Sequence, residues 1–297
     1  MKLKLHERLA VALLKGLRCL SLKTLYHVTC VIYFMLKPFP LRVKKTIARN
    51  LECCLPGTVS PDAVLFHTFW RIVEMPFFWF SSKKALDKVF LKVTDEDQFQ
   101  AEFSEGAGAI VITSHFGAWE MVNAYMGPRY PCVTLYKPLR HAYQEELVRI
   151  ARERYGVEFF EASMGGVKKV FESLKQGKCL GIMSDHDPGE NGGIFVPFFG
   201  VPANTMTLPI KLIQKSKANV YTLSAERLPK GRGFHLRFTK VEGLRGVSVE
   251  EATTRMNEAI ENIVMQAPEQ YEWSYKRFRR TEWEGRGFYV KMPPTSK

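Results

Sequence analysis

Residues 109–127 read AIVITSHFGAWEMVNAYMG. The uniformly apolar run 109–113 is typical of a short strand buried on both faces of a sheet. The residues that follow predict a helix over 117–127. A strand leading through one tight turn into a helix is the repeating unit of α/β sheets, so this stretch sets the expected fold class.

The same alternation continues on both sides of this stretch. Strands are predicted at 89–93, 132–136, 158–160, 179–183 and 195–199, with two longer ones near 219–227 and 233–242. Helices are predicted at 95–105, 141–155, 164–176, 206–216 and 248–266. Strands that alternate with helices of this length favour a largely parallel sheet covered on both faces. We expect an α/β fold, a three-layer sandwich around a mixed, largely parallel sheet.

The first part of the chain has a different composition. Residues 41–55 have helical apolar spacing, and Ser60-Pro61 begins another helix that is rich in Phe and Trp. We expect residues 1–80 to be an N-terminal helical, membrane-associating segment and residues 81–297 to be the catalytic α/β domain. The aromatic density of the second helix is more often core than site, with bilayer contact as the second interpretation.

Membrane attachment is suggested by residues 9–36, which are apolar but interrupted by Lys15, Arg18 and Lys23. The uncharged stretch 24–36 is shorter than the about 20 residues of a spanning helix. A basic helix with a broad apolar face suits the membrane interface. A tilted marginal span and a core-packing helix are the alternatives.

The formal net charge of +13 concerns partners more than fold. Anionic lipid headgroups and acidic proteins both fit this charge. Nucleic acid is not expected as a partner, because the chain has no zinc-finger spacing, no RNP-like motif and no basic low-complexity arm. The six cysteines are scattered and form no C-x-x-C pair, which favours free thiols over metal ligation.

Polar clusters follow three of the predicted strands. Ser114-His115 comes after 109–113, Lys137-Pro138 after 132–136, and Ser184-Asp185-His186-Asp187 after 179–183. Ligands of open α/β sheets bind beyond the carboxyl ends of the strands. We therefore expect these clusters to meet at one edge of the sheet.

The pair His115 and Glu120 is the first candidate for chemistry. A carboxylate on one ring nitrogen of His115 fixes the tautomer, so that the other nitrogen takes a proton from an attacking hydroxyl. Glu120, in the first turn of the predicted helix, is placed to supply that carboxylate. The alternative is a carboxylate at a helix start beside a structural histidine.

Two further clusters carry weaker signals. Asp185, His186 and Asp187 suggest a metal, but they complete no EF-hand loop and the chain has no H-E-x-x-H helix, so no metal or cofactor is expected. Arg149 and Arg152 share one face of the predicted helix 141–155 and suit phosphate recognition, or else form a solvated, salt-bridged surface. The chain also lacks the G-x-S-x-G elbow of serine hydrolases and the glycine-rich loops of nucleotide sites.

The string ITSHFGAWE, residues 112–120, resembles the H-x4-(D/E) motif of glycerolipid-type acyltransferases. Its context resembles one branch, the late acyltransferases of lipid A biosynthesis, which transfer lauroyl or myristoyl chains. Three more blocks agree in order and spacing: YKP (136–138) with Arg152-Glu-Arg154, then SDHDPG with GGIFVPFFGVPANT (192–205), and APEQYEWSYKRFR (267–279). Gly117-Ala118 replaces a bulkier pair often seen inside the motif.

The resemblance implies that His115, oriented by Glu120, deprotonates an acceptor hydroxyl that attacks the thioester of an acyl carrier protein. It also implies that Arg152 and Asp185 act in catalysis, and that backbone amides near Gly117 or Arg152 stabilise the oxyanion. The implied partners are acyl carrier protein as donor, a glycolipid acceptor and a membrane surface, on the cytoplasmic face of the cell inner membrane. The residues expected to bind substrate are Ser114, Gly117, Lys137, Arg149, Arg154, Asp187 and Thr205.

Three alternatives to lipid A acylation remain open at this point. The same machinery acylates another amphiphile, such as an ornithine-type lipid or a lysophospholipid. A non-catalytic, membrane-surface lipid-binding module would keep the fold without the chemistry. A metal-dependent hydrolase would use Asp185, His186 and Asp187.

Overall fold

The computed structural model describes residue 16 and residues 20–138, 154–283 and 286–289. Its centre is a seven-stranded sheet with strand order β1-β9-β8-β2-β5-β3-β4. The strands are β1 (Phe90–Thr94), β2 (Ala109–Thr113), β3 (Cys132–Tyr136), β4 (Glu158–Glu161), β5 (Cys179–Met183), β8 (Asn219–Arg227) and β9 (Phe234–Lys240). All neighbours pair in parallel except β8 and β9, so the prediction of a mixed, largely parallel sheet is confirmed.

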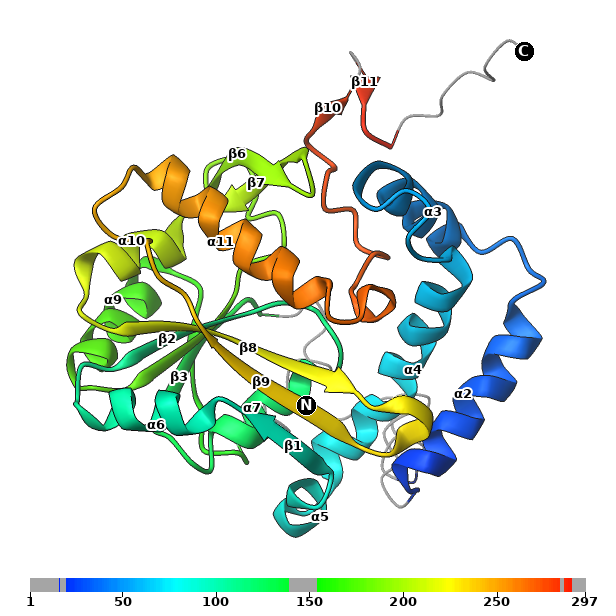
Figure 1. Ribbon diagram of the computed structural model, residues 1–297, viewed down its shortest axis with the longest axis horizontal. Coiled ribbons are helices and arrows are strands. Elements are labelled where there is room, and N and C mark those ends of the chain that lie inside the picture. Colours follow the sequence, from blue (N-terminus) through cyan, green and yellow to red (C-terminus); the bar gives the residue numbers. More distant parts are fainter. Residues whose placement is uncertain (1–15, 17–19, 139–153, 284–285, 290–297) are drawn as a thin grey trace, which may run out of the picture.

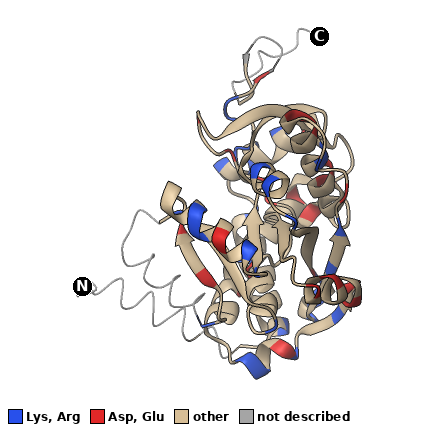
Figure 2. Cartoon of the chain, turned by 90° about the vertical axis from the view of Figure 1, so that its left-hand side faces the viewer, with Lys and Arg blue, Asp and Glu red and all other residues tan. Residues whose placement is uncertain are grey.

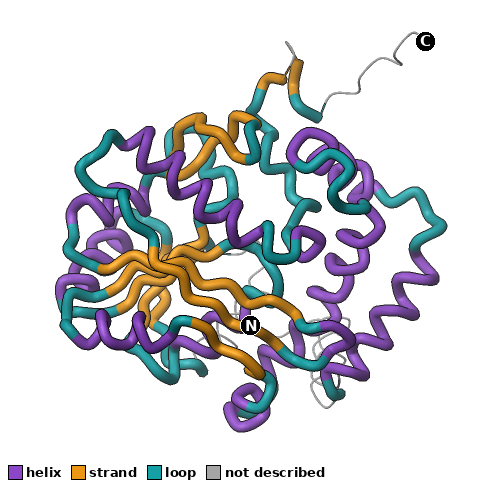
Figure 3. The backbone as a smooth tube through the Cα atoms, in the orientation of Figure 1, coloured by secondary structure: helices purple, strands orange, loops and turns teal. Residues whose placement is uncertain are grey.

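Helices cover both faces of the sheet (Figure 1; Figure 3). One face packs against α9 (Met164–Lys175), α10 (Leu208–Lys215) and α11 (Val249–Val264), which bury a core with Ile110, Ile112 and Leu180. The other face packs against α6 (Glu96–Ser104) and α7 (Glu120–Met126), around Val111 and Cys179. Side chains of β2 and β5 therefore alternate between two cores, as a strand buried on both faces requires.

The first four helices that the structure describes in full are α2 (Leu22–Leu36), α3 (Arg42–Cys54), α4 (Pro61–Phe80) and α5 (Lys83–Asp87). Ser60 caps α4 by accepting a hydrogen bond from the amide of Asp62, with Pro61 in the first turn. The helix ends at the predicted boundary near residue 80. Its side chains nevertheless enter both cores, Val64 and Leu65 on one side and Phe77 and Phe78 on the other.

Among the residues that the structure describes, no helix has the length and apolar character needed to cross a membrane. The 15 residues of α2 extend about 22 Å, against the about 30 Å of a hydrocarbon core. The N-terminal membrane-associated segment expected from the sequence is therefore not supported as a span. Basic and acidic residues are interspersed along the described helices, strands and loops (Figure 2).

A small hairpin lies beside the main sheet and was only half predicted. Strand β6 (Gly193–Phe198) pairs in antiparallel fashion with β7 (Val201–Met206), which the sequence pattern did not indicate. Phe199 and Gly200 connect them with φ of 49° and 75°. Positive φ at both central residues is the requirement of a two-residue type I′ turn. The usual signal for that turn is Asn-Gly or Asp-Gly, and a Phe at the first position conceals it.

Candidate active site

A cavity of about 590 Å³ opens at the carboxyl ends of β2, β5 and β3. His115 follows β2 and lines this cavity, as do Lys137 after β3 and Asp187 after β5. The prediction that three polar clusters meet at one edge of the sheet is therefore confirmed. The remaining walls come from α7 and the C-terminal segment, with Trp119, Val122 and Asn123 on one side and Tyr275 and Arg279 on the other.

Asp185 holds His115 in place through two contacts. The backbone N–H of His115 donates to Asp185 Oδ2 at 2.8 Å, and Nδ1 of the ring lies 2.9 Å from Oδ1. Asp185 is 1% exposed, so both of its oxygens act inside the protein. An ionised carboxylate only accepts hydrogen bonds, which places the proton on Nδ1 and leaves Nε2 with a free lone pair. This is the tautomer that a general base needs.

Electrostatics in this pair favour the charged forms. Burial alone would lower the pKa of His115, but the charge and hydrogen bond of Asp185, together with the charge of Glu272, raise it above the ordinary imidazole value. The pKa of Asp185 is lowered, because the charge and hydrogen bonds of His115 and the charge of His186 outweigh its burial. Asp185 therefore stays ionised at neutral pH and stabilises an imidazolium at His115.

The carboxylate on Nδ1 is thus not the one that the motif spacing suggested. Glu120 was expected to orient the ring, and it is the first residue of α7, 3% exposed. Its charge contributes to the raised pKa of the buried Tyr155 hydroxyl, which places it near that side chain. The spacing of the motif puts Glu120 at the start of α7, while the acceptor that fixes the tautomer, Asp185, follows β5.

Three aromatic rings are stacked at the mouth of the cavity. The His186 ring lies parallel to that of His115, with centroids 3.7 Å apart and an interplanar angle of 2°. The Tyr275 ring covers the other face of His186 at 3.8 Å. Nε2 of His186 lies 3.4 Å from Glu272 Oε2, and Arg71 of α4 donates to Glu272 Oε1 at 2.6 Å. The stack and this charge chain fix the position of His186 against the ring of His115.

His115, His186 and Glu272 bring one potential ligand atom each to within 4.8 Å of one another, which raises the question of a metal. A histidine binds a metal through a lone pair in the plane of its ring, at about 2.0–2.1 Å for zinc. Parallel rings 3.7 Å apart have parallel planes, so one ion does not lie in both. The ring geometry does not fit a shared ion, and none of the chemistry argued below needs one.

The cationic side of the mouth is built on Asp187. Its buried carboxylate accepts from Arg279 Nε at 2.9 Å and lies 3.3 Å from Arg280 Nε, while the amide of Gly189 donates to it at 2.7 Å. Arg279 lines the cavity with 46% of its side chain exposed, and Lys137 lies exposed at the same mouth. Asp187 therefore positions a cation at the mouth instead of contacting an anionic substrate itself, which refines its predicted role in binding.

The backbone conformation at position 117 and a close neighbouring strand require a glycine there. Its φ is 55°, and a Cβ there would lie 2.1 Å from the carbonyl oxygen of Ala225. Its N–H donates to the carbonyl of Gln270 at 3.1 Å, so this amide is occupied and does not face a substrate. The close approach of α7 to β8 therefore explains the glycine, and a role of Gly117 in substrate binding stays a prediction.

Three other predicted binding residues lie outside the lining of the cavity, and two of them have partners within the protein. Ser114 is buried and lies outside the cavity lining that the structure describes. Thr205 is fully buried, where its hydroxyl accepts from Arg277 at 2.7 Å. Arg154 donates to the carbonyls of Trp79 and Ser81 at the end of α4, at 2.8 and 2.7 Å. Burial of Ser114 and Thr205 and the backbone partners of Arg154 give each residue a structural environment of its own, and their roles in substrate binding stay predictions. Arg149 and Arg152 lie outside the described residues.

Sequence reasoning missed Glu272, Tyr275 and Arg279 as site residues. All three lie in the segment 267–279, which was treated as a family signature and not as part of the site. The segment reaches the site through an antiparallel bridge between Phe116 and Tyr271, and through the amide of Glu272, which donates to the carbonyl of His115 at 3.1 Å. A pairing between residues this far apart in the chain has no local pattern that would have revealed it.

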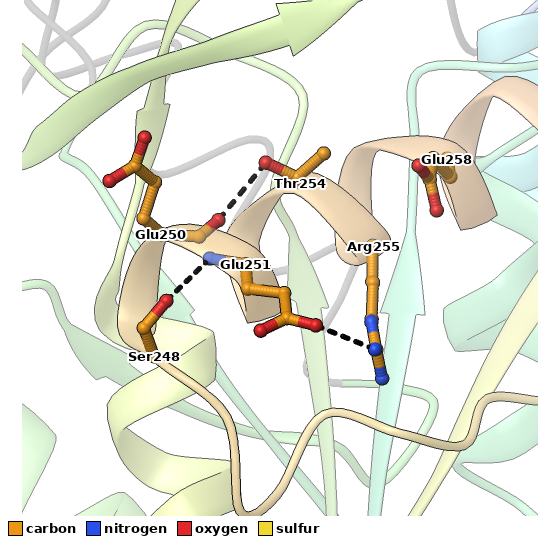
Figure 4. Close-up of a pocket in the computed structure, with 6 residues that line it drawn as sticks. All are labelled: Ser248, Glu250, Glu251, Thr254, Arg255 and Glu258. Atoms are coloured by element: carbon orange, nitrogen blue, oxygen red, sulfur yellow. Dashed lines mark hydrogen bonds and ion pairs between the residues drawn. The ribbon is translucent and has the colours of Figure 1, made fainter.

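A second hollow, of about 430 Å³, lies on the outer side of α11 (Figure 4). All of its lining residues come from the first three turns of this helix or its N-cap: Ser248, Glu250, Glu251, Thr254, Arg255 and Glu258. The one cation among these six, Arg255, is held by Glu251 at 2.7 Å and by the carbonyl of Gly243 at 2.6 Å. A binding site needs walls from several elements, which this hollow lacks.

Comparisons with known proteins agree with the site. The model of the family described as bacterial lipid A biosynthesis acyltransferase matches residues 3–280. The lipid A biosynthesis palmitoleoyltransferase of Escherichia coli K12 is 27% identical over 255 residues, covering 82% of this chain and 81% of that protein. The lauroyltransferase of the same organism is 25% identical, covering 86% and 85%. A phosphatidylinositol mannoside acyltransferase of Mycobacterium tuberculosis H37Rv is 24% identical, covering 69% and 66%. The match over nearly the whole chain and the geometry at His115 together show that this protein is an acyltransferase of the bacterial lipid A biosynthesis acyltransferase family.

Proposed function

We propose that this protein transfers a fatty acyl chain from the thioester of acyl carrier protein to a hydroxyl of a lipid A precursor, with His115 as general base. The observation that carries the proposal is the hydrogen bond that Nδ1 of His115 donates to Asp185, in a cavity at the carboxyl ends of the parallel strands. It leaves Nε2 as the ring nitrogen that accepts a proton.

The proposed reaction needs one proton acceptor and no redox step. Nε2 of His115 takes the proton of the acceptor hydroxyl as its oxygen attacks the thioester carbonyl carbon. The tetrahedral intermediate then collapses, the C–S bond breaks, and the leaving thiolate takes the proton from the imidazolium. Asp185 stabilises that imidazolium throughout, because its charge lies 2.9 Å from Nδ1.

Glu120 keeps a proposed role in catalysis, but not that of the group hydrogen-bonded to Nδ1. Its place at the start of α7 and its near-complete burial put a second carboxylate close to the site. Of the donors expected for the oxyanion, the amide of Gly117 is occupied by Gln270. Arg152, the other expected donor, remains a proposal.

The cationic mouth supports an anionic donor and acceptor. Lys137 and Arg279 flank the opening, and the formal net charge of the whole chain is +13. Acyl carrier proteins are acidic and lipid A precursors carry phosphates, so both substrates suit this field. A guanidinium such as that of Arg279 also matches the geometry of a phosphate.

We propose further that the protein works at a membrane surface, on the cytoplasmic face of the cell inner membrane. The end of α2 and the residues after it present exposed apolar side chains: Val31, Phe34, Met35 and Phe39 are 60%, 81%, 64% and 60% exposed. Lys37 and the basic start of α3 lie beside them. Apolar side chains rimmed by cations are the pattern of a helix that lies in the interface of an anionic bilayer.

The test is an acyl-transfer assay in which thioesters of acyl carrier protein are mixed with a lipid A precursor and the products are weighed by mass spectrometry. The expected result is a mass gain of one acyl chain, lost by at least about 100-fold in His115→Ala and reduced in Glu120→Gln. A His115→Ala protein with near-normal turnover would refute the general base. If the wild type adds no mass to the lipid A precursor with any of the thioesters, this acceptor is rejected.

The second candidate function is the same transfer onto another amphiphile. It is favoured by one specific observation, the match to a protein named as a phosphatidylinositol mannoside acyltransferase. If the lipid A precursor gains no mass, lysophospholipids, ornithine-type lipids and mannosylated inositol lipids are the next acceptors. A protein that binds these lipids but acylates none of them would be the lipid-binding module instead.

A further inference from the structure

Gly181 lies in the middle of the central strand β5, with unusual free space in front of it. A Cβ built on this residue would meet no atom within 4 Å, and its φ lies outside the left-handed region. Neither close backbone approach nor a special turn therefore explains a glycine in a strand interior, where glycine is ordinarily unfavourable. The space belongs to the cavity that His115 lines.

The free space lies at the boundary between two hollows. Gly181, Val122 and Asn123 line both the main cavity and a small apolar recess beyond it. The recess holds only about 10 Å³ and is closed by Val111, Met126, Cys132, Val157 and Cys179. These residues are buried and belong to the core on the α7 side of the sheet. The recess is therefore the floor of the cavity. Gly181 lies next to this floor, and the space in front of its Cα is empty.

The distance from the reacting end to this floor follows from the register of the sheet. Gly181 pairs with Val111, four residues before His115 along the chain of β2. At a rise of about 3.3 Å per strand residue, this separation is roughly 13 Å. The path between the two runs along one face of the sheet past Thr113, Thr134 and Met183, with α7 as its opposite wall. Val122 and Met183 contribute apolar walls to this path, which suit a hydrocarbon chain.

We propose that Gly181 is a specificity-determining residue that sets the length of the acyl chain. The acyl chain lies along this face of the sheet with its carbonyl at His115 and its methyl end over Gly181, against the floor made by Met126, Cys132 and Cys179. This inference rests on the proposed acyl transfer. Any side chain at position 181 would occupy the space of the terminal carbons, and a smaller side chain at position 126 would deepen the floor.

The experiment measures kcat/KM for acyl thioesters of graded even length, from octanoyl to palmitoyl, in the wild type and in Gly181→Ala, Gly181→Val and Met126→Ala. One methylene in an apolar pocket changes kcat/KM by about 10- to 200-fold. We expect the preferred length to become shorter in Gly181→Ala and shorter still in Gly181→Val. In Met126→Ala it should become longer.

A matched control is Gly165→Ala on α9, on the other side of the sheet. Like Gly181, it has no left-handed φ, and its Cβ would meet only Ser163 Oγ at 3.9 Å. This variant should keep the wild-type profile. Because Gly181→Ala adds one carbon to open space, its melting temperature should equal or exceed that of the wild type, which separates a length effect from misfolding.

A second readout needs no turnover. Thermal stabilisation by free saturated fatty acids of the same lengths should peak at one length in the wild type and at a shorter one in Gly181→Val. An active Gly181→Val enzyme with an unchanged length profile would overturn the assignment while leaving acyl transfer intact. A wild type that transfers no acyl chain from any thioester would reject the proposed function, and the fatty-acid series would then show separately whether the cavity holds a hydrocarbon chain of fixed length.

Discussion

Replacing Asp185 by Asn tests how the site prepares its base. In the wild type, Asp185 accepts from both the backbone N–H and Nδ1 of His115, at 2.8 and 2.9 Å. Asn has nearly the same shape but only one accepting oxygen. If that oxygen keeps the backbone N–H, its NH₂ group faces Nδ1 and forces the proton onto Nε2. The nitrogen that should take the hydroxyl proton then carries one already.

The expected loss follows from this change of tautomer. The corresponding Asp→Asn change in a Ser-His-Asp triad lowers kcat by about 10⁴-fold, and loss of a general base costs about 10²–10⁴-fold. We therefore expect kcat of Asp185→Asn to fall by about 10²–10⁴-fold, or about 3–5 kcal/mol of transition-state stabilisation. KM should change little, because Asp185 lies outside the cavity lining that the structure describes.

The pH dependence of the activity provides a second, independent test of the role of Asp185. A general base must be neutral, so wild-type activity should rise as the pH increases through the pKa of His115. Burial lowers that pKa, but Asp185 and Glu272 together hold it above the ordinary value. Without the charge of Asp185 the pKa of His115 falls, so the acid limb of the residual activity should move to lower pH.

The assay is steady-state acyl transfer across a pH series, with Asp87→Asn as the control. Asp87 also forms an ion pair, with Arg129 at 3.1 Å, but on the exposed surface of α5, where such a pair contributes about 0–1 kcal/mol. The reasoning is refuted if Asp185→Asn retains more than about a tenth of the wild-type kcat, well short of the about 100-fold minimum loss. An acid limb that stays at the wild-type pH would refute the electrostatic part alone.

Four further outcomes are expected. Glu272→Gln should move the acid limb of kcat to lower pH, but by less than Asp185→Asn does, because Glu272 contributes less to raising the pKa of His115; an unchanged pH profile would contradict this. Gly117→Ala should lower the free energy of unfolding by at least about 1–3 kcal/mol in chemical denaturation, because its Cβ would clash with the carbonyl of Ala225 at a φ of 55°. Arg279→Ala should raise KM for the anionic substrates, with a smaller change in kcat and a weaker dependence on salt; a loss confined to kcat would place Arg279 in the chemical step instead. Full activity should persist after exhaustive chelator treatment, because the parallel rings of His115 and His186 do not suit a shared metal ion. A loss of activity that zinc restores would contradict this expectation.

The sheet was predictable because its strands carry local signals. The boundaries of 109–113, 132–136 and 179–183 agree with β2, β3 and β5, since each run is short, mostly apolar and bounded by polar or turn residues. The longer strand predicted near 219–227 agrees with β8. The rule that ligands bind at the carboxyl ends of parallel strands then brought His115 and Asp185 to one edge. Their contact at 2.9 Å follows from β2 and β5 being direct neighbours in the sheet.

What the sequence did not reveal depends on contacts between distant segments. Motif spacing pointed to Glu120 as the carboxylate on His115, because a residue five positions along the chain is the natural local candidate. Asp185 lies 70 residues away and reaches the ring only after the sheet has formed. Likewise, the partners of Thr205 and Arg154, which are Arg277 and the carbonyls of Trp79 and Ser81, come from distant segments and have no local signal.

The N-terminal helices belong to the same electrostatic unit as the catalytic residues. Glu74 of α4 forms a fully buried ion pair with Arg227 at the end of β8, and breaking such a pair by removing one partner costs about 3–5 kcal/mol. One turn earlier, Arg71 holds Glu272, which contacts His186 on the face of the catalytic ring. Helix α4, which packs against α2, thus reaches His115, the proposed general base, through a chain of charges and stacked rings. The boundary predicted at residue 80 follows a change in composition, while Arg71 before it holds Glu272 beside the two histidines after it.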